Sequence, residues 1–245
     1  LVPAYSGPCR GGMVSRQDGH AQPAQTLRAF VNAACKSGAK LITRCRMTEV
    51  LPKSSGICVV SQDGRRFQSE VVVNCAGAWG KRIAACIHDE LPIEPAALSM
   101  MVTARLPRFI TPVVGVEGRK LSFKQMDNGT VVIGGAHRAV LDMANEATRM
   151  DFSEMQKSAR TVRDCFSLME NATIVRCWAG IEGIMRDGLP VIDASRTTPG
   201  VFHVCGFSAH GFQLSPMVGR LAASLAMGNK PELSLEAFSL NRFKA

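Results

Sequence analysis

Residues 71–80 have the sequence VVVNCAGAWG. Three consecutive β-branched residues predict a strand, and an unbroken apolar run is typical of a strand buried on both faces. The small residues Ala76 and Gly77 then predict a turn, and a short helix should follow through Cys86. Small residues let a flat ligand approach the backbone, and a helix start offers unpaired N–H groups. Turns of this kind also occur for packing alone, so the stretch is only a candidate cofactor site.

Strand and helix signals alternate on both sides of this stretch. A helix from Ala24 to Lys36 is predicted by apolar residues at helical spacing: Leu27, Phe30, Val31 and Ala34. Strand-like runs lie at 41–43 and 57–61, and Gln62-Asp63-Gly64 is a turn signal. Near the C-terminus, short strands over 172–205 precede a final helix over roughly 212–227. Ser215-Pro216 is a plausible cap and first-turn pair for that helix.

The middle of the chain has a different pattern. Strand-like runs at 98–105, 119–125 and 130–138 predict an antiparallel sheet, and Asp127-Asn128-Gly129 is a good hairpin turn between the last two. Residues 152–170 carry apolar positions at helical spacing and predict an amphipathic helix.

This order predicts a mixed α/β (α+β) fold of two interleaved domains. One is a Rossmann-like layer built from residues 17–90 and 175–245. The other is an antiparallel-sheet domain built from residues 1–16 and 91–174.

The composition and charge of the chain argue against several classes of protein. The 245 residues are 46% apolar and carry a net charge of +9, as in a folded protein. No apolar run approaches the roughly 20 residues of a membrane span, and no leader pattern opens the chain. The positive charge is scattered, which argues against nucleic-acid binding. The nine cysteines have irregular spacing without a C-x-x-C pair, which favours free, mostly buried thiols in a reducing cytoplasm and predicts no metal site.

Two further motifs can carry chemistry. Residues 206–216, GFSAHGFQLSP, are mostly small or flexible and lead into a helix, whose partial positive end stabilises an anion. A reduced flavin is such an anion. The alternative is a tight turn in which His210 caps a backbone group. Residues 178–183, WAGIEG, place Glu182 in an apolar stretch, where it is either a functional carboxylate or a solvated or hydrogen-bonded one.

Five segments in this order resemble one protein family: DGHAQP at 18–23, VVVNCAGAWG at 71–80, VIGGAHR at 132–138, WAGIEGIMRDGLPVI at 178–192 and GFSAHGFQLSPMVGR at 206–220. The chain resembles the FAD-dependent amino-acid and amine oxidoreductases that include D-amino acid oxidase, glycine oxidase and sarcosine oxidase. Within that family it is most similar to flavin subunits of heteromeric enzymes, namely those of opine oxidase, hydrogen cyanide synthase and sarcosine oxidase.

The resemblance implies that FAD is the cofactor and that an amine or amino acid is the substrate. A hydride would pass from the carbon bearing the amine to the flavin, and partner subunits would carry electrons onward. The cofactor-binding positions implied are Val50, Ala76, Gly77 and Trp79 for the adenosine half, and Gly180, His210, Gly211, Phe212, Gln213 and Leu214 for the isoalloxazine. Glu182 and Ala209 would contact the substrate, and His210 is the candidate acid or base.

The sequence departs from the family pattern in three places. No G-x-G-x-x-G occurs in the 245 residues, so the FAD pyrophosphate lacks its usual partner. We expect a chain truncated at its N-terminus, and the alternative is a non-catalytic remnant that has lost FAD binding. The resemblance implies that relatives oxidising amino acids carry, at the position of Glu182, an arginine that pairs with the substrate carboxylate, and that some also carry an arginine at the position of Ala209. A cationic substrate group therefore fits Glu182 better. Ile184 and Met185 stand where some relatives carry a cysteine linked to FAD, so covalent attachment is not expected.

Overall fold

The computed structural model describes residues 2–243 and divides the chain into two compact units. Unit 1 contains Leu1–Gln22 and Ala96–Ile181, and unit 2 contains Pro23–Pro95 and Glu182–Ala245. Each unit is thus assembled from two separate stretches of sequence. The predicted mixed α/β fold class is confirmed.

Unit 1 is built on a seven-stranded sheet in the order β10-β9-β5-β8-β7-β6, with β11 also pairing with β5. Its strands are β5 (Glu94–Thr103), β6 (Val114–Val116), β7 (Arg119–Gln125), β8 (Val131–Gly134), β9 (Arg138–Asp142), β10 (Ala147–Arg149) and β11 (Ile174–Ile184). The β7–β8 pair is antiparallel, with Phe123 opposite Ile133, as the turn at 127–129 predicted. The β9–β10 and β5–β8 pairs are antiparallel too.

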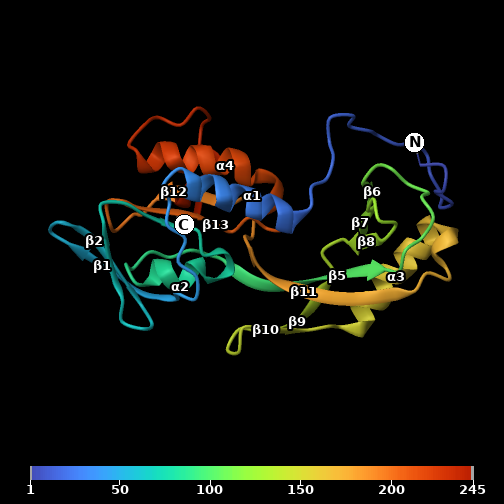
Figure 1. The fold of residues 1–245 in the computed structure, drawn as a ribbon, viewed down its shortest axis with the longest axis horizontal. Helices are drawn as coiled ribbons and strands as arrows, with labels where there is room; N and C mark the ends of the chain where they lie inside the picture. The colour runs from blue at the N-terminus through green and yellow to red at the C-terminus, as the bar shows by residue number, and fades with distance from the viewer. Residues whose placement is uncertain (1, 244–245) are drawn as a thin grey trace. The chain divides into compact units, whose positions relative to one another are not determined.

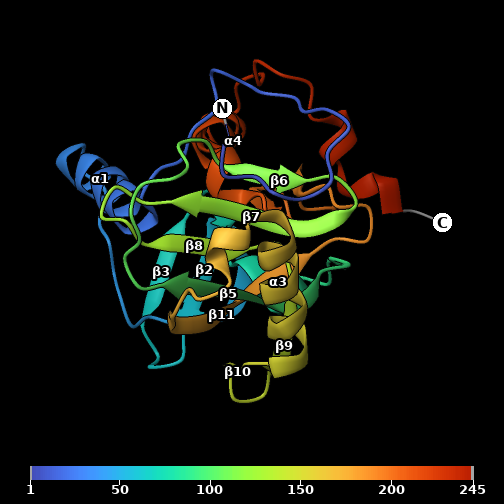
Figure 2. The same ribbon diagram turned by 90° about the vertical axis from the view of Figure 1, so that its right-hand side faces the viewer.

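Helix α3 (Phe152–Cys165) crosses one face of this sheet (Figure 2). The Asp151 side chain caps its start by accepting hydrogen bonds from the backbone N–H groups of Ser153 and Glu154. Beneath the helix, the buried rings of Phe123 and Phe166 stack with centroids 4.3 Å apart. The predicted helix over 152–170 therefore exists but ends early, and the 3-10 turn η2 (Ser167–Met169) follows it.

Unit 2 contains two three-stranded sheets, β1-β2-β3 and β12-β13-β4. The strands are β1 (Met47–Lys53), β2 (Gly56–Ser61), β3 (Arg66–Ser69), β4 (Val72–Asn74), β12 (Val191–Ala194) and β13 (Val201–Cys205). The helical segments are α1 (Pro23–Lys36), η1 (Gly77–Trp79), α2 (Gly80–Ala85), α4 (Gly211–Ala226), η3 (Glu236–Phe238) and η4 (Leu240–Phe243). Helix α4 lies along β12 and β13 (Figure 1), where Val218 packs on Ile192 and Val204. Strands β4 and β13 are parallel.

Three strand predictions in unit 2 were wrong in detail. Residues 41–43 form no strand, and Leu41 and Ile42 are exposed, because no neighbouring strand pairs with them among the described residues. Strand β3 was missed because its sequence RFQS has no apolar run, yet it completes the hairpin with β2. The valines at 71–73 are only half-buried, although both faces of β4 are covered: Val72 packs against the cluster of Val50 and Ile57, and Val73 against that of Ile192 and Val204.

The predicted cap of the last helix was also wrong. Helix α4 begins at Gly211, so Pro216 lies inside it rather than in its first turn. Proline has no N–H and cannot bond the carbonyl four residues earlier, which belongs to Phe212. The Ser215 hydroxyl donates to that same carbonyl at 2.9 Å. Ser215 therefore supplies, within the helix, the hydrogen bond that Pro216 removes.

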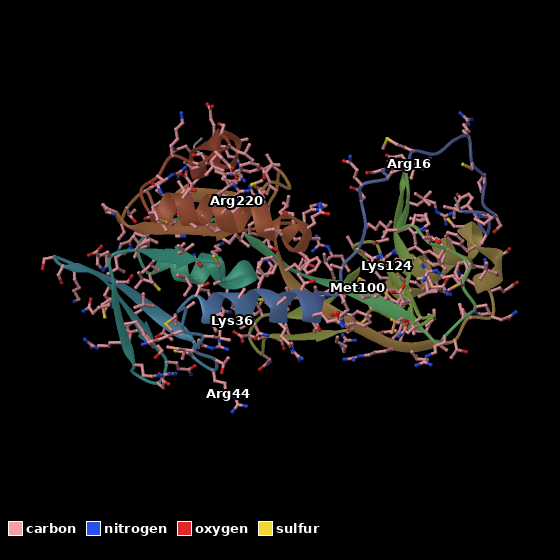
Figure 3. The ribbon with its side chains drawn as sticks, turned by 45° about the horizontal axis from the view of Figure 1, so that its top comes forward. Arg16, Lys36, Arg44, Met100, Lys124 and Arg220 are labelled. Carbon is pink, nitrogen blue, oxygen red and sulfur yellow. The ribbon has the colours of Figure 1, made fainter. Side chains whose placement is uncertain are left out.

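The nine cysteines are free thiols, but only Cys58, Cys165 and Cys205 are buried. The expectation that most would be buried was wrong, because several lie in short runs on exposed segments such as α1. Burial raises the pKa of Cys205 to about 12, so this thiol stays protonated. The basic residues are spread over the surface: Lys36, Arg44 and Arg220 lie on different elements, and the Arg44 side chain points away from the ribbon (Figure 3).

Helix α1 has its predicted apolar stripe but no buried residue. Leu27 and Phe30 are 65% and 54% exposed, because nothing in the described part of the chain packs over them. We expect the double variant Leu27→Ser/Phe30→Ser to change the free energy of unfolding by less than about 0.5 kcal/mol per site. Urea denaturation measures this. In contrast, Val162→Ala in the core of unit 1 should cost about 1.5–3 kcal/mol, and an equal loss in both proteins would show that α1 is packed.

Candidate functional site

The loop after β13 and the first turn of α4 present exposed backbone, and we call residues 206–214 the shelf. The shelf begins with unusual backbone geometry: φ is positive at Gly206 (76°), Ser208 (50°) and Ala209 (72°). Residues other than glycine seldom adopt such angles, and two in succession are strained. Strain of this kind persists only where the surroundings impose it, and it is concentrated at functional sites.

The end of β11 holds this loop in place. The Ser208 N–H donates to the carbonyl of Gly183 at 3.1 Å, and the Ser208 hydroxyl accepts from the N–H of Met185 at 3.0 Å. A Cβ atom on Gly206 would lie 2.6 Å from the Met185 sulfur, and φ is 76° there, so any other residue would be strained. Ser208 was not singled out from the sequence, since a serine in a glycine-rich turn is ordinary.

The shelf ends at a helix start whose N–H groups lack acceptors within the helix. The first helical hydrogen bond runs from the Leu214 N–H to the His210 carbonyl at 3.2 Å, and no side chain caps this end. The N–H groups of Gly211, Phe212 and Gln213 therefore have no helical partner. Together with the helix dipole, they favour an anion at this position.

Glu182 faces the shelf from the end of β11. Its half-buried carboxylate lies near the backbone N–H of Ala209 and near His210. Burial raises the pKa of Glu182, and this effect outweighs those of the Ala209 N–H and His210, which act in the opposite direction. The structure thus brings together Glu182, Ala209 and His210, which the sequence had selected separately.

His210 is exposed, and its Nδ1 lies 3.3 Å from the amide nitrogen of Gln213. The alternative in which the His210 ring caps a backbone group is not observed, since α4 has no side-chain cap. The exposed side chains of Phe212, Gln213 and Leu214 follow.

The second predicted region is the turn after β4. Gly77 has a φ of 54°, and a Cβ atom there would meet open space. The Ala76 N–H is bonded to Asn74 Oδ1 at 3.2 Å, and the Trp79 N–H to the Ala76 carbonyl at 2.9 Å. Val50 is a buried core residue of β1, 1% exposed and opposite Val59 in the antiparallel pair with β2.

Gly180 belongs to unit 1. It lies in β11, its φ is not in the left-handed region, and a Cβ atom on it would have no heavy atom within 4 Å. Neither its backbone conformation nor packing within the described residues therefore requires glycine. Gly183, three residues later, differs: its Cβ would lie 3.0 Å from Ile93 and 3.3 Å from Ala78.

Other features of the described residues add no competing site. A surface cavity of about 720 Å³ is lined by Arg44, Cys45, Arg46, Gln62 and Asp63, and none of these was predicted to be functional. Asp63 is already paired with Arg65 at 2.7 Å. Residues 2–243 contain no cluster of three or more metal-ligating side chains. None of the helices they form combines the length and apolarity that crossing a bilayer requires.

A family model described as FAD dependent oxidoreductase matches residues 1–225. The chain therefore belongs to this family of flavoenzymes, whose cofactor is FAD. The resemblance seen in the five sequence segments is confirmed.

Individual relatives are distant. The hydrogen cyanide synthase subunit HcnC of Pseudomonas aeruginosa is 24% identical over 99% of this chain and 57% of its own length. The sarcosine oxidase subunit beta of Rhizobium meliloti is 24% identical over 97% of this chain and 56% of its own. The structure of L-proline dehydrogenase from P. horikoshii superposes with a TM-score of 0.84 at 25% identity, covering 91% of this chain and 60% of that one. The chain thus spans little more than half the length of these relatives.

The residues present fit part of FAD. Gly77 and Gly180 leave space where any other residue would place a side chain, and the shelf offers unpaired N–H groups where a flavin anion could be stabilised. No residue of the sequence supplies the G-x-G-x-x-G turn for the pyrophosphate. The chain thus offers open space at two glycines and free N–H groups on the shelf, without the usual turn for the pyrophosphate.

Proposed function

We propose that this chain is the flavin-binding part of an enzyme that oxidises a C–N bond in an amino acid, an opine or a secondary amine, with a cationic group of the substrate held by Glu182. One observation carries this proposal: a half-buried carboxylate lies beside the exposed backbone of the shelf. A carboxylate there attracts a cation and repels the carboxylate of a simple amino acid.

Each residue has a distinct part in this proposal. Val50, Ala76, Gly77 and Trp79 would contact the adenosine, while Gly180 and the shelf residues His210 to Leu214 would line the isoalloxazine. FAD, when bound, supplies the acceptor for the hydride. The N–H groups at the start of α4 would stabilise negative charge there. The Nδ1 of His210 is next to Gln213, so its Nε2 is the atom that would exchange a proton with the substrate amine.

The printed names of two relatives describe subunits of larger enzymes, hydrogen cyanide synthase and sarcosine oxidase. We extend this to a partner subunit that takes electrons from this chain, in the cytoplasm. The second candidate is a non-catalytic remnant of the same fold. Bound FAD in the protein expressed from its complete gene would exclude that candidate.

The variant Glu182→Gln tests the substrate assignment. In the protein expressed from its complete gene, we expect the apparent affinity for an arginine-derived opine to fall about tenfold or more. Anaerobic bleaching of the flavin measures this. Because burial raises the pKa of Glu182, the carboxylate is protonated as the pH falls through that raised value. The affinity of the wild type for the opine should fall in the same pH range, whereas the affinity of Glu182→Gln should not change with pH.

Stability provides the internal control. A buried acid with a raised pKa opposes folding when it is ionised, so Glu182→Gln should be equally or more stable at pH 7, by less than about 1 kcal/mol because the group is half-exposed. Glu236→Gln, at an exposed position, should change neither property. Unaltered affinity for the opine in Glu182→Gln would remove the substrate assignment and leave the flavin assignment standing.

A further inference from the structure

A buried polar chain in unit 2 remains outside the site described so far. Asp89, His203 and Asn74 are 4%, 0% and 3% exposed and come from three separate segments. The His203 Nε2 lies 2.9 Å from an oxygen of Asp89, and its Nδ1 lies 3.1 Å from the side-chain nitrogen of Asn74. Polar groups buried this deeply are costly unless all of them are paired.

The pairing fixes the direction of every hydrogen bond. Asn74 Oδ1 accepts from the Ala76 N–H at 3.2 Å, so the other atom of its amide must be the NH₂ group. That group donates to the Gly80 carbonyl at 2.9 Å, and its second hydrogen points to His203 Nδ1. His203 Nδ1 is therefore an acceptor. The histidine must be neutral, with its hydrogen on Nε2, where it donates to Asp89.

Asp89 anchors the other end of the chain. Its second oxygen accepts from the backbone N–H of Arg196 at 3.2 Å. Burial alone would raise the pKa of Asp89, but hydrogen bonds from Ser195 and His203 outweigh this effect and keep the pKa below its ordinary value. The carboxylate is thus charged and cannot change partners without leaving a buried N–H unpaired.

The last link of the chain sets the backbone of a turn. Asn74 holds both sides of it, accepting from the Ala76 N–H and donating to the Gly80 carbonyl. Gly77 lies within this turn. A Cβ atom added to it would have no heavy atom within 4 Å, and this open side is where we propose that the adenosine binds. None of the three polar side chains needs to touch the cofactor to determine where Ala76 and Gly77 lie.

We propose that Asp89, His203 and Asn74 form a positioning relay that holds the Ala76-Gly77 turn in the shape that binds the adenosine part of FAD. The inference rests on the proposed function for its ligand, but the relay itself is a property of this chain. His203 is the central element, because only its neutral Nε2–H form satisfies Asp89 and Asn74 together.

The test compares two buried amides that each hold a loop. Asn74→Ala removes the relay's contact with the turn. Gln125→Ala is the matched control, because Gln125 is 1% exposed in unit 1 and its side chain bonds the backbone of Phe109, Leu106, Pro107 and Gly129. In the protein expressed from its complete gene, FAD affinity should fall about tenfold or more in Asn74→Ala and less than about twofold in Gln125→Ala. Asn74→Ser, whose hydroxyl can still accept from the Ala76 N–H, should recover part of the loss.

Two measurements on the unaltered 245-residue chain need neither FAD nor a variant. Long-range ¹H–¹⁵N correlation spectra should show His203 neutral and protonated on Nε2 at pH 7, and the Ala76 amide should be protected from hydrogen exchange. A His203 protonated on Nδ1, or an unprotected Ala76 amide, would overturn the relay. Equal losses of FAD affinity in Asn74→Ala and Gln125→Ala would reduce it to a general stabilising role. Absence of FAD binding with the expected tautomer present would instead count against the proposed function and against the ligand assigned to this turn.

Discussion

Replacing His203 with alanine is expected to lower the free energy of unfolding by about 3–5 kcal/mol, because it leaves the Asp89 carboxylate charged, 1% exposed at its side chain and without its main partner. The cavity left by a fully buried imidazole adds to this cost. The two tryptophans allow a local measurement, since Trp79 lies in unit 2 and Trp178 in unit 1. In a Trp178→Phe background, fluorescence during urea denaturation reports on unit 2 alone.

The loss should depend on pH in a defined direction. The folded-state pKa of Asp89 is lowered, so the stability it contributes is present above its ordinary pKa of about 4 and is lost as the pH falls through the lower folded value. Without His203, burial should raise the pKa of Asp89, and the variant can then take up a proton in mild acid and relieve its buried charge. The difference between wild type and His203→Ala should therefore shrink as the pH falls through that raised value, which lies above the ordinary pKa of about 4.

An exposed ion pair serves as the control for His203→Ala. Asp63 and Arg65 are 2.7 Å apart but solvent-exposed, so Asp63→Ala should leave the urea midpoint nearly unchanged. A loss below about 1 kcal/mol in His203→Ala would show that the buried pair contributes no more than a surface pair. A loss that does not vary with pH would show that the cavity, rather than the carboxylate, causes it.

Elements that are defined by residues close together in the sequence were predicted correctly. The β7–β8 hairpin was found because Asp127-Asn128-Gly129 defines the turn and both strands are apolar, and α3 was found because its stripe repeats at helical spacing. Strand β3 was missed because its pairing with β2, rather than its composition, makes it a strand. Pro216 was misplaced because its tolerance inside α4 depends on the Ser215 hydroxyl, a contact that the sequence pattern does not show.

The candidate site also has one part that a short sequence motif predicts and other parts that depend on contacts formed only in the fold. The shelf was predictable because glycine and small residues before a helix are a local signal. The contact of Glu182 with Ala209 could not be derived, since the two residues lie on different elements and meet only in the fold. The pairing of Asp89 with His203 joins positions 114 residues apart. In the sequence, His203 is simply one polar residue within an apolar strand.

Two glycines of β11 differ in their surroundings: Gly183 packs closely against other residues, whereas Gly180 faces open space. Of the variants proposed, Gly180→Leu is expected to reduce FAD binding the most. A Cβ atom at Gly180 meets no heavy atom within 4 Å in the folded chain, so we expect the free energy of unfolding to change by less than about 0.5 kcal/mol. If the isoalloxazine lies there, a leucine side chain occupies its place, and FAD affinity should fall by a factor of about 100 or more. Flavin absorbance and fluorescence, measured on the protein expressed from its complete gene, report this affinity.

The matched variant Gly183→Leu should behave in the opposite manner. Its side chain would collide with Ile93 and Ala78, so it should destabilise unit 2 by about 1–3 kcal/mol or prevent folding. Gly180→Ala, which adds a single methyl group, should bind FAD with an affinity between those of wild type and Gly180→Leu. A Gly180→Leu protein that folds and binds FAD as tightly as wild type would contradict the placement of the ring beside β11. Since the two glycines are only three residues apart on one strand, loss of FAD at Gly180 without loss of stability is an effect that a general perturbation of β11 would not produce.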